Sequence, residues 1–442
     1  MSPAPDSASV RRPARLRGSI AIPGDKSITH RALLFNALAR GEARIDRFLD
    51  AADTRSTIDC LRMLGVDIQE PAPGVVVVRG AGRAAFTEPD DALDCGNSGT
   101  TMRLLAGMLA GLPMLAVLTG DASLRQRPMG RILRPLTALG ADVTGRSEGT
   151  LPPLVIRGGP LAGGALVETP VASAQVKSAL LLAGLAADGP TTVVEPARSR
   201  DHTERMLDAM GATVQVDGTA VTITPPDGDL TAADIAVPGD ISTAAPWIVA
   251  ATLHPDAELV LTGVGVNPTR TGLLDVLWEM GADIELLKER TTSGEPVADL
   301  RVRSAPLRGV EVGGDLVPRA IDELPLVALA GALADGETVI RDAAELRVKE
   351  SDRVATTAMV LGSLGVELKQ RPDGMAVRGG AHLQGARVDS EGDHRLVMLA
   401  AVAGLLADGE TVVDDASAVS VSYPEFWAEL ARLGAAPAVA SR

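Results

Sequence analysis

The feature that most constrains the fold is a helix ending that recurs six times along the 442 residues. Each ending is an amphipathic run that closes on Leu-Gly or Met-Gly and leads into a short extended segment. A glycine directly after a helix supplies the left-handed residue that other side chains resist. Successive glycines lie 75, 71, 70, 84 and 69 residues apart, at Gly65, Gly140, Gly211, Gly281, Gly365 and Gly434. This near-constant period predicts six copies of one structural unit.

A second, more apolar helix is expected before each of these endings. The apolar runs begin near Lys26, Asn97, Ala174, Ser242, Asp322 and His394. Helices that are apolar on all sides are buried, so each unit should hold one buried and one amphipathic helix together with several strands. A unit of about 70 residues buries its own sheet poorly, and units should therefore group into larger α/β domains.

Two nearly identical turns predict where one domain begins and ends. Ile22-Pro23-Gly24-Asp25 is echoed by Val237-Pro238-Gly239-Asp240, and three of the six glycines lie between them. We expect a central three-repeat domain at 23–237 and a discontinuous second domain at 1–22 and 238–442, with hinges at both turns. Residues 1–18 carry Pro and Arg and lack the apolar block of a signal peptide, which predicts a disordered tail in preference to a short transit sequence.

Composition excludes several classes of function. A net charge of −15 and a pI near 4.9 argue against binding to nucleic acid or to an anionic membrane, both of which need a basic face. The longest apolar run, 396–407, is too short to span a bilayer. Cys60 and Cys95 are too few for a disulfide framework and are not spaced like a metal site, so we expect a reducing, cytoplasmic environment.

The charged residues gather at predicted helix starts. In Pro23-Gly24-Asp25-Lys26-Ser27-Ile28-Thr29-His30-Arg31, a turn opens into an apolar helix that Asp25 or Ser27 can cap. The free N–H groups of a first helical turn attract anions, and Lys26 and Arg31 add full charges. This stretch alone could equally be a solvated helix start.

Similar clusters recur at corresponding points of the other repeats. They are 97–103, 125–128, 173–177, 200–202, 319–323, 349–353 and 393–395. A solvated helix face would account for any one of them. Their repetition in an acidic protein favours a shared site for small anions.

Taken together, these motifs resemble the 5-enolpyruvylshikimate-3-phosphate synthase family. The resemblance rests on Gly24-Asp25-Lys26-Ser27, Gly96-Asn97-Ser98-Gly99-Thr100, Arg127-Pro128-Met129, Ser173-Ala174-Gln175, Arg200-Asp201-His202, Asp322-Glu323, Lys349-Glu350-Ser351-Asp352-Arg353 and Asp393-His394-Arg395. They stand in the family's order over about residues 19–434. The resemblance implies a two-domain enolpyruvyl transferase fold, an inverse α/β barrel of six βαβαββ repeats, three per domain, with helix N-termini facing a cleft.

The resemblance also implies a reaction and its site. The carboxyvinyl group of phosphoenolpyruvate would pass to the 5-hydroxyl of shikimate 3-phosphate with release of phosphate, without a metal or organic cofactor and in a monomer. Shikimate phosphate would be held by Lys26, Ser27, Arg31, Ser173, Ala174, Gln175, Arg200, Asp322 and Lys349. Phosphoenolpyruvate would meet Lys26, Gly99, Arg127, Gln175, Arg353 and Arg395.

The catalytic roles follow from the same resemblance. Asp322 would take the hydroxyl proton, Glu350 would deliver a proton to the methylene carbon, and Lys26 would share in either transfer. Glyphosate inhibits many members of the family and would lie against the Gly99 backbone. The chain departs from the pattern at Val421, where many members carry Lys, and at Glu345, where many carry Asn.

Two other functions compete with this interpretation. The related UDP-N-acetylglucosamine carboxyvinyl transferases carry a Cys in the loop before Arg-Pro, whereas the loop Gly120-Asp121-Ala122-Ser123 before Arg127 has none. A catalytically silent repeat scaffold would need no ordered cations and carboxylates at helix starts and would bind no small phosphates.

Overall fold

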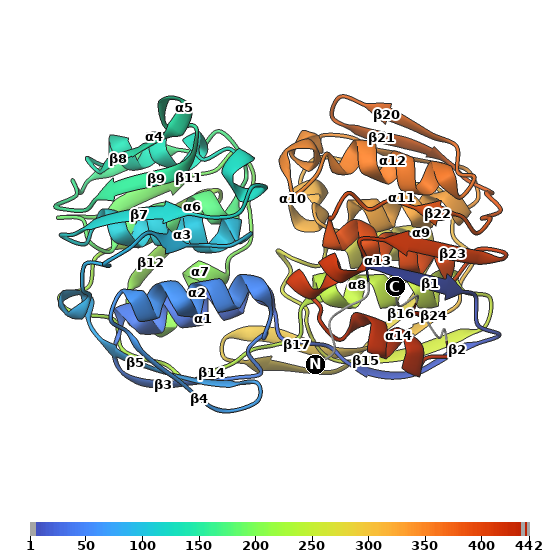
Figure 1. The fold of residues 1–442 in the computed structure, drawn as a ribbon, viewed down its shortest axis with the longest axis horizontal. Coiled ribbons are helices and arrows are strands. Elements are labelled where there is room, and N and C mark those ends of the chain that lie inside the picture. Colours follow the sequence, from blue (N-terminus) through green and yellow to red (C-terminus); the bar gives the residue numbers. More distant parts are fainter. Residues whose placement is uncertain (1–5, 435–437, 440–442) are drawn as a thin grey trace. The chain divides into compact units, whose positions relative to one another are not determined.

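The computed structural model describes residues 6–434 and 438–439, which divide into two compact units (Figure 1). The central unit comprises Gly24–Val237 and Thr292–Glu295. The terminal unit comprises the described residues up to Pro23, Pro238–Thr291, and those from Pro296 onward. The chain therefore passes between units beside both Pro-Gly-Asp turns.

The described strands form six four-stranded sheets with one shared order. When the strands are numbered within a repeat, they lie side by side in the order first, second, fourth, third, so the third strand is at the edge of the sheet. In β6-β7-β9-β8, for example, β6 (Leu93–Asp94) is parallel to β7 (Leu115–Thr119), which is antiparallel to β9 (Leu151–Arg157), and β9 is antiparallel to β8 (Asp142–Gly145). With helices after the first and second strands, each repeat is a βαβαββ unit.

The central unit holds three such repeats. Its other strands are β3 (Arg40–Asp46), β4 (Asp67–Ala72), β5 (Val75–Ala81), β10 (Ala165–Glu168), β11 (Thr191–Val194), β12 (Thr213–Asp217), β13 (Ala220–Thr224) and β14 (Ile235–Ala236). Its helices are α1 (Lys26–Leu38), α2 (Ala52–Met63), α3 (Gly99–Ala110), α4 (Gly130–Ala138), the single turn α5 (Arg146–Gly149), α6 (Ala174–Gly184) and α7 (His202–Ala209). The last strand, β14, returns to complete the first sheet beside β3.

The terminal unit repeats this plan. Its strands are β1 (Ser7–Arg11), β2 (Leu16–Ala21), β15 (Ala257–Gly265), β16 (Asp283–Thr292), β17 (Glu295–Arg303), β18 (Glu311–Val312), β19 (Glu337–Ile340), β20 (Leu368–Arg371), β21 (Gly374–Arg378), β22 (Arg387–Val388), β23 (Glu410–Asp414) and β24 (Ala438–Val439). Its helices are α8 (Ile241–Leu253), α9 (Gly272–Met280), α10 (Leu316–Ala320), α11 (Leu324–Leu333), α12 (Arg353–Ser363), α13 (His394–Gly404) and α14 (Phe426–Arg432).

The most apolar helix of each repeat is buried, as the sequence predicts. Helices α1, α3 and α6 carry the core of the central unit, and α8, α11 and α13 that of the terminal unit. Helices α3 and α6 approach so closely that a methyl group on Gly107 would lie 2.1 Å from the carbonyl oxygen of Ala179. Only glycine fits there.

The six repeated glycines all adopt the left-handed conformation that the sequence predicts. Their φ angles lie between 87° and 104° at Gly65, Gly140, Gly211, Gly281, Gly365 and Gly434. Each of these glycines follows closely on the amphipathic helix of its repeat, so this helix ends at the same point in all six repeats.

The prediction of a disordered tail over residues 1–18 is wrong for the described part. Strand β1 pairs antiparallel with β23, from Ser7 opposite Asp414 to Arg11 opposite Glu410, and supplies the fourth strand of the last repeat. Figure 1 shows it in dark blue beside β23. Ala8 and Val10 are buried, which gives the segment an inward face. Strand β2 begins at Leu16, so the described part of the tail belongs to the folded terminal unit; residues 1–5 lie outside the described residues.

The central unit also contains a segment that the expected boundary 23–237 leaves out. Thr292–Glu295, the tip of the β16–β17 hairpin, belongs to it. Ser293 Oγ accepts a hydrogen bond from the Ala236 N–H at 3.0 Å, and Glu295 Oε1 lies 2.7 Å from His202 Nδ1. No sequence signal distinguishes this tip from an ordinary hairpin turn.

Candidate active site

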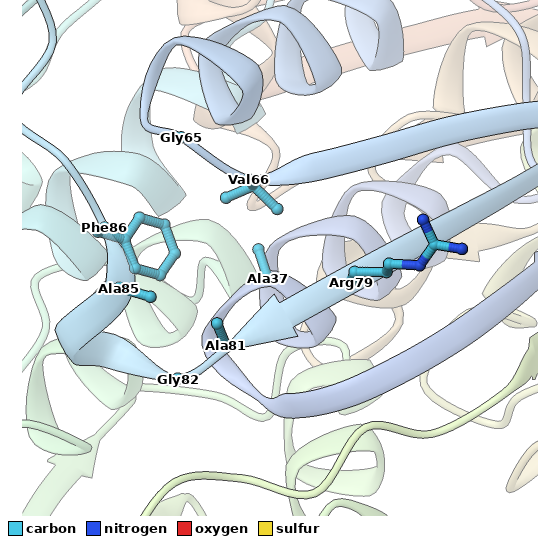
Figure 2. Close-up of a pocket in the computed structure, with 8 residues that line it drawn as sticks. All are labelled: Ala37, Gly65, Val66, Arg79, Ala81, Gly82, Ala85 and Phe86. Atoms are coloured by element: carbon cyan, nitrogen blue, oxygen red, sulfur yellow. The ribbon is translucent and has the colours of Figure 1, made fainter.

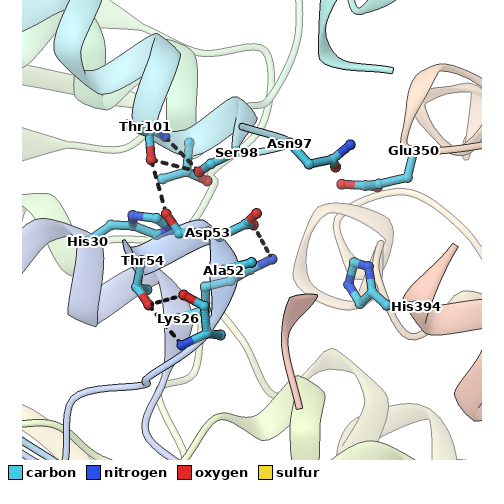
Figure 3. A network of polar contacts seen from close by, with 12 residues as sticks. Lys26, His30, Ala52, Asp53, Thr54, Asn97, Ser98, Thr101, Glu350 and His394 are labelled. Carbon is cyan, nitrogen blue, oxygen red and sulfur yellow. Dashed lines mark hydrogen bonds and ion pairs between the residues drawn. The ribbon is translucent and has the colours of Figure 1, made fainter. Parts of the chain in front are cut away.

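The start of α1 is built as the sequence predicts, with Asp25 as its cap. The Asp25 carboxylate accepts a hydrogen bond from the Ile28 N–H at 2.9 Å. Gly24 lies against the backbone, since an added methyl group would be 2.0 Å from the Arg47 carbonyl oxygen. Lys26 Nζ is 2.9 Å from Asp53 Oδ2, and both side chains are largely buried (Figure 3). The sequence analysis did not identify Asp53, because this residue at the start of α2 belongs to none of the charged motifs.

Arg31 is a buried cation whose hydrogen bonds all go to neutral groups among the described residues. Its Nε donates to Thr203 Oγ1 at 2.7 Å, one Nη to Ser178 Oγ at 2.8 Å, and the other to the Ser27 carbonyl oxygen at 3.0 Å. Burial lowers the pKa of Arg31 to about 10, with Glu204 opposing this shift and the nearby charge of Arg200 adding to it. Two cations thus lie close together beside α1, α6 and α7, an arrangement suited to a phosphate.

The start of α6 offers an amide group to the same region. Gln175 donates from Nε2 to Thr100 Oγ1 at 2.7 Å, which ties α6 to the start of α3. Its Oε1 is buried and has no hydrogen-bond partner among the described residues. Ser173 precedes the helix as its cap residue, and Ala174 is its first residue.

Helix α3 begins between two arginines. Ser98 caps it by accepting from the Thr101 N–H at 3.1 Å. Arg127, 7% exposed, donates to Asn97 Oδ1 at 2.5 Å. A methyl group on Gly99 would lie 2.8 Å from a terminal nitrogen of Arg103 and 3.4 Å from one of Arg127. Arg103 is part of the motif 97–103, but the sequence assigned it no role.

A chain of hydroxyl groups joins α1, α2 and α3, and Figure 3 shows its last link, between Thr101 and Ser98. His30 Nδ1 is 2.7 Å from Thr57 Oγ1, which is 2.7 Å from Thr101 Oγ1, and this hydroxyl is 2.7 Å from Ser98 Oγ. Burial lowers the pKa of His30 well below its ordinary value, with help from Lys26 and Arg31, so this imidazole is neutral near pH 7. The chain fixes α1, α2 and α3 without adding charge.

The terminal unit gathers the predicted carboxylates around one guanidinium. Arg353 is 1% exposed and lies 2.5 Å from Glu350 Oε2, 2.8 Å from Asp393 Oδ2 and 3.1 Å from Asp322 Oδ1. Burial acts to lower the pKa of Arg353, but the three carboxylates raise it above the ordinary value. For Asp393 burial raises the pKa, yet Arg353 holds it below its usual value. Arg353 is therefore an anchor for carboxylates in this structure.

Two further cations face Asp322. Lys349 Nζ is 3.7 Å from Asp322 Oδ1, and one Nη of Arg395 is 3.6 Å from Asp322 Oδ2. Burial lowers the pKa of Lys349, while Asp322 and Glu345 act to raise it. Glu345 thus brings a negative charge close to Lys349, at the position where the resemblance implies Asn. The other departure, Val421, ends a short helical turn at 416–421.

An open hollow of about 210 Å³ in the central unit (Figure 2) contains none of the predicted site residues and is lined by Ala37, Gly65, Val66, Arg79, Ala81, Gly82, Ala85 and Phe86. Among the described residues, no group of three or more His, Cys, Asp or Glu side chains could hold a metal ion. Within the same residues, no helix has the length and apolarity needed to cross a membrane.

The repeated βαβαββ architecture with cations at its helix starts defines the class of protein. Its fold is that of the enolpyruvyl transferases: the enolpyruvyl transferase NikO from Streptomyces tendae superposes with a TM-score of 0.79 over 98% of each chain at 20% identity. The EPSP synthase from Acinetobacter baumannii superposes with a TM-score of 0.87 at 41% identity, covering 98% of this chain and all of that one.

Sequence comparison defines the family within this class. The family model for EPSP synthase (3-phosphoshikimate 1-carboxyvinyltransferase) matches residues 10–430. The 3-phosphoshikimate 1-carboxyvinyltransferase of Roseiflexus sp. strain RS-1 is 56% identical over 428 residues, which are 96% of this chain and 98% of that protein. That of Roseiflexus castenholzii is 57% identical over 424 residues, covering 95% and 98%.

The chain belongs to the EPSP synthase family. It is a transferase of the shikimate pathway of aromatic amino-acid biosynthesis. The reaction transfers the carboxyvinyl group of phosphoenolpyruvate to the 5-hydroxyl of shikimate 3-phosphate and releases phosphate.

Proposed function

We propose that the central unit binds the phosphate of shikimate 3-phosphate beside Arg31 and Arg200. The observation that carries this proposal is the buried Arg31 guanidinium, whose hydrogen-bond partners among the described residues are neutral. A buried charge without a counterion is costly, and an anionic ligand offsets that cost. The remaining contacts to this substrate come from Lys26, Ser27, Ser173, Ala174, Gln175, Asp322 and Lys349.

Phosphoenolpyruvate carries a phosphate and a carboxylate and needs cations at both ends. We assign its contacts to Lys26, Gly99, Arg127, Gln175, Arg353 and Arg395. The Gly99 N–H group begins α3, and two guanidiniums flank it, which suits a phosphate. Arg353 would exchange one of its carboxylate partners for the carboxylate of phosphoenolpyruvate.

Asp322 and Glu350 carry the proton transfers in this proposal. The 5-hydroxyl oxygen bonds to C2 of phosphoenolpyruvate as its proton passes to Asp322, and C3 takes a proton from Glu350, which gives a tetrahedral intermediate. A C3 proton then returns to the Glu350 carboxylate as the bond from C2 to the phosphate oxygen breaks, which releases phosphate and restores the double bond. Glu350 must be protonated to act as the acid, which requires its contact with Arg353 to loosen when substrate arrives. Lys26 shares in either transfer.

These contacts are divided between the two units, which we propose to be the functional domains at 23–237 and at 1–22 with 238–442. Neither unit alone carries both the phosphate-binding arginines and the acid and base. The central unit can therefore bind the phosphate of shikimate 3-phosphate by itself, whereas catalysis needs residues of both units.

We further propose a cytoplasmic monomer that acts on small anions and not on nucleic acid. The two cysteines are free and buried, which suits a reducing compartment. The exposed large apolar side chains, for example Leu166 and Val216, are few. The net charge of −15 disfavours polyanions.

A pair of neighbouring arginines tests the phosphate site. Arg200→Ala should raise the dissociation constant for shikimate 3-phosphate by roughly tenfold to a hundredfold, the scale of a lost charged contact of about 1.5–3 kcal/mol. Arg198→Ala is the control, since Arg198 is two residues away, 57% exposed, and paired with Asp201 at 3.5 Å. Equal effects of the two variants in titration calorimetry would contradict the assignment.

A further inference from the structure

Glu195, a buried carboxylate after β11, lies between the two segments that we assign to shikimate phosphate. Its Oε1 accepts a hydrogen bond from the Ser173 N–H at 3.1 Å, at the start of α6. Its Oε2 accepts one from the Ser199 N–H at 3.3 Å, directly before Arg200. Glu195 is 3% exposed, so these bonds form in a low dielectric environment where they count most.

A buried ammonium group holds this carboxylate in place. Lys177 Nζ is 2.9 Å from Glu195 Oε2 and 2.7 Å from Glu204 Oε1, and its side chain is 1% exposed. Lys177 belongs to α6 and Glu204 to α7, so the cluster joins both helices. The negative charge of Glu204 also acts to raise the pKa of Arg31, against the larger lowering effect of burial.

We infer that Glu195 is a positioning residue for shikimate phosphate, an inference that rests on the proposed function. One carboxylate fixes the distance between the Ser173–Gln175 helix start and the segment that carries Arg200. It sets this distance through two backbone N–H groups, so the side chains of both segments remain available to the substrate. Lys177 keeps the carboxylate oriented through its contact with Oε2 at 2.9 Å.

An amide cannot replace this carboxylate. Glu195→Gln leaves one oxygen acceptor and introduces an NH₂ group that donates. If the NH₂ replaces Oε1 it faces the Ser173 N–H, and if it replaces Oε2 it faces the Ser199 N–H and the Lys177 ammonium. One of the two segments must then move, whichever orientation the amide adopts.

Steady-state kinetics separate positioning from general support of the fold. In Glu195→Gln we expect the KM for shikimate 3-phosphate to rise roughly tenfold or more, equivalent to about 1.4 kcal/mol. The kcat should change less than about threefold, and the KM for phosphoenolpyruvate, which shares only Gln175 with these segments, should rise less than the KM for shikimate 3-phosphate. The matched control is Glu168→Gln, the same change at an exposed carboxylate at the end of β10, which should leave all three constants unchanged.

The outcomes distinguish this inference from the proposed function. An unchanged KM for shikimate 3-phosphate, or equal rises for both substrates, would overturn the role of Glu195 while the proposed function stands. A wild-type protein that releases phosphate but does not bind shikimate 3-phosphate through Arg200 would instead overturn the proposed site.

Hydrogen exchange provides a measurement that does not depend on how well Glu195→Gln folds. In the wild-type protein the Ser173 and Ser199 amide protons should exchange slowly, because both donate to a buried acceptor. In Glu195→Asp, which keeps the charge but shortens the reach, exchange at both amides should accelerate together. Exchange of either amide at the rate of an unstructured chain in the wild-type protein would refute the inference.

Discussion

Two arginines of equal burial should differ sharply in how much the protein loses stability when each is replaced by the same residue. Arg31 and Arg353 are each 1% exposed. Arg31 donates only to neutral groups among the described residues, whereas Arg353 holds three carboxylates, one of them the fully buried Asp393. We predict that Arg31→Met leaves the free energy of unfolding within about 1 kcal/mol of the wild type, while Arg353→Met lowers it by about 3–5 kcal/mol.

The magnitudes follow from the contacts. Lowering the pKa of Arg31 from its ordinary value to about 10 corresponds to a cost of about 3 kcal/mol for the charged form. Removing the side chain relieves that cost and loses three hydrogen bonds of about 1 kcal/mol each. Ser178 Oγ and Thr203 Oγ1 are 2.6 Å apart and remain bonded to each other. Removing Arg353 instead leaves the buried Asp393 carboxylate without its guanidinium partner.

Urea unfolding measures both effects. All three tryptophans, Trp247, Trp278 and Trp427, lie in the terminal unit, so their fluorescence reports the unit that contains Arg353. Far-ultraviolet circular dichroism reports both units. Arg31→Met should also lose measurable affinity for shikimate 3-phosphate despite its unchanged stability. Equal destabilisation by the two substitutions would refute the distinction between Arg31, which we assign to an anionic ligand, and Arg353, which binds carboxylates of the protein.

Three other predictions concern catalysis and binding. Asp322→Asn and Glu350→Gln should each lower kcat by roughly 10²-fold or more with smaller changes in KM, and full activity in either variant would contradict its assigned role. Gly99→Ala places a methyl group 2.8 Å from a terminal nitrogen of Arg103. Because glyphosate is the longer anion, this group should weaken inhibition by glyphosate more than it weakens binding of phosphoenolpyruvate, measured as the ratio of inhibitor constant to KM. Because burial lowers the pKa of Lys349, its ammonium group loses its proton at a pH below the ordinary value of 10.5. The affinity for shikimate 3-phosphate should therefore fall as the pH rises through this lowered pKa. Lys349→Arg should remove this decline in a pH series of binding constants.

The repeating architecture could be predicted because its signals are local. A glycine that must adopt a positive φ after a helix is visible in the sequence, and so is a helix that is apolar on all sides. The structure confirms both kinds of signal. Local reasoning also places Arg31 within α1, whereas it left the cap open between Asp25 and Ser27, and the structure selects Asp25.

Contacts between distant segments could not be predicted in this way. Strand β1 pairs with β23 about 400 residues later, and its inward face consists of only Ala8 and Val10. Lys26 meets Asp53, and Glu195 joins Ser173 to Ser199, through contacts that no periodicity announces. Such contacts depend on how the repeats pack, which a single sequence does not specify locally.

The most direct test of the central claim is release of phosphate from phosphoenolpyruvate. With shikimate 3-phosphate present, the purified protein should release one phosphate for each carboxyvinyl group transferred to the 5-hydroxyl. With UDP-N-acetylglucosamine in its place, or with phosphoenolpyruvate alone, release should remain at background. Release that does not depend on shikimate 3-phosphate, or that occurs with UDP-N-acetylglucosamine instead, would contradict the account.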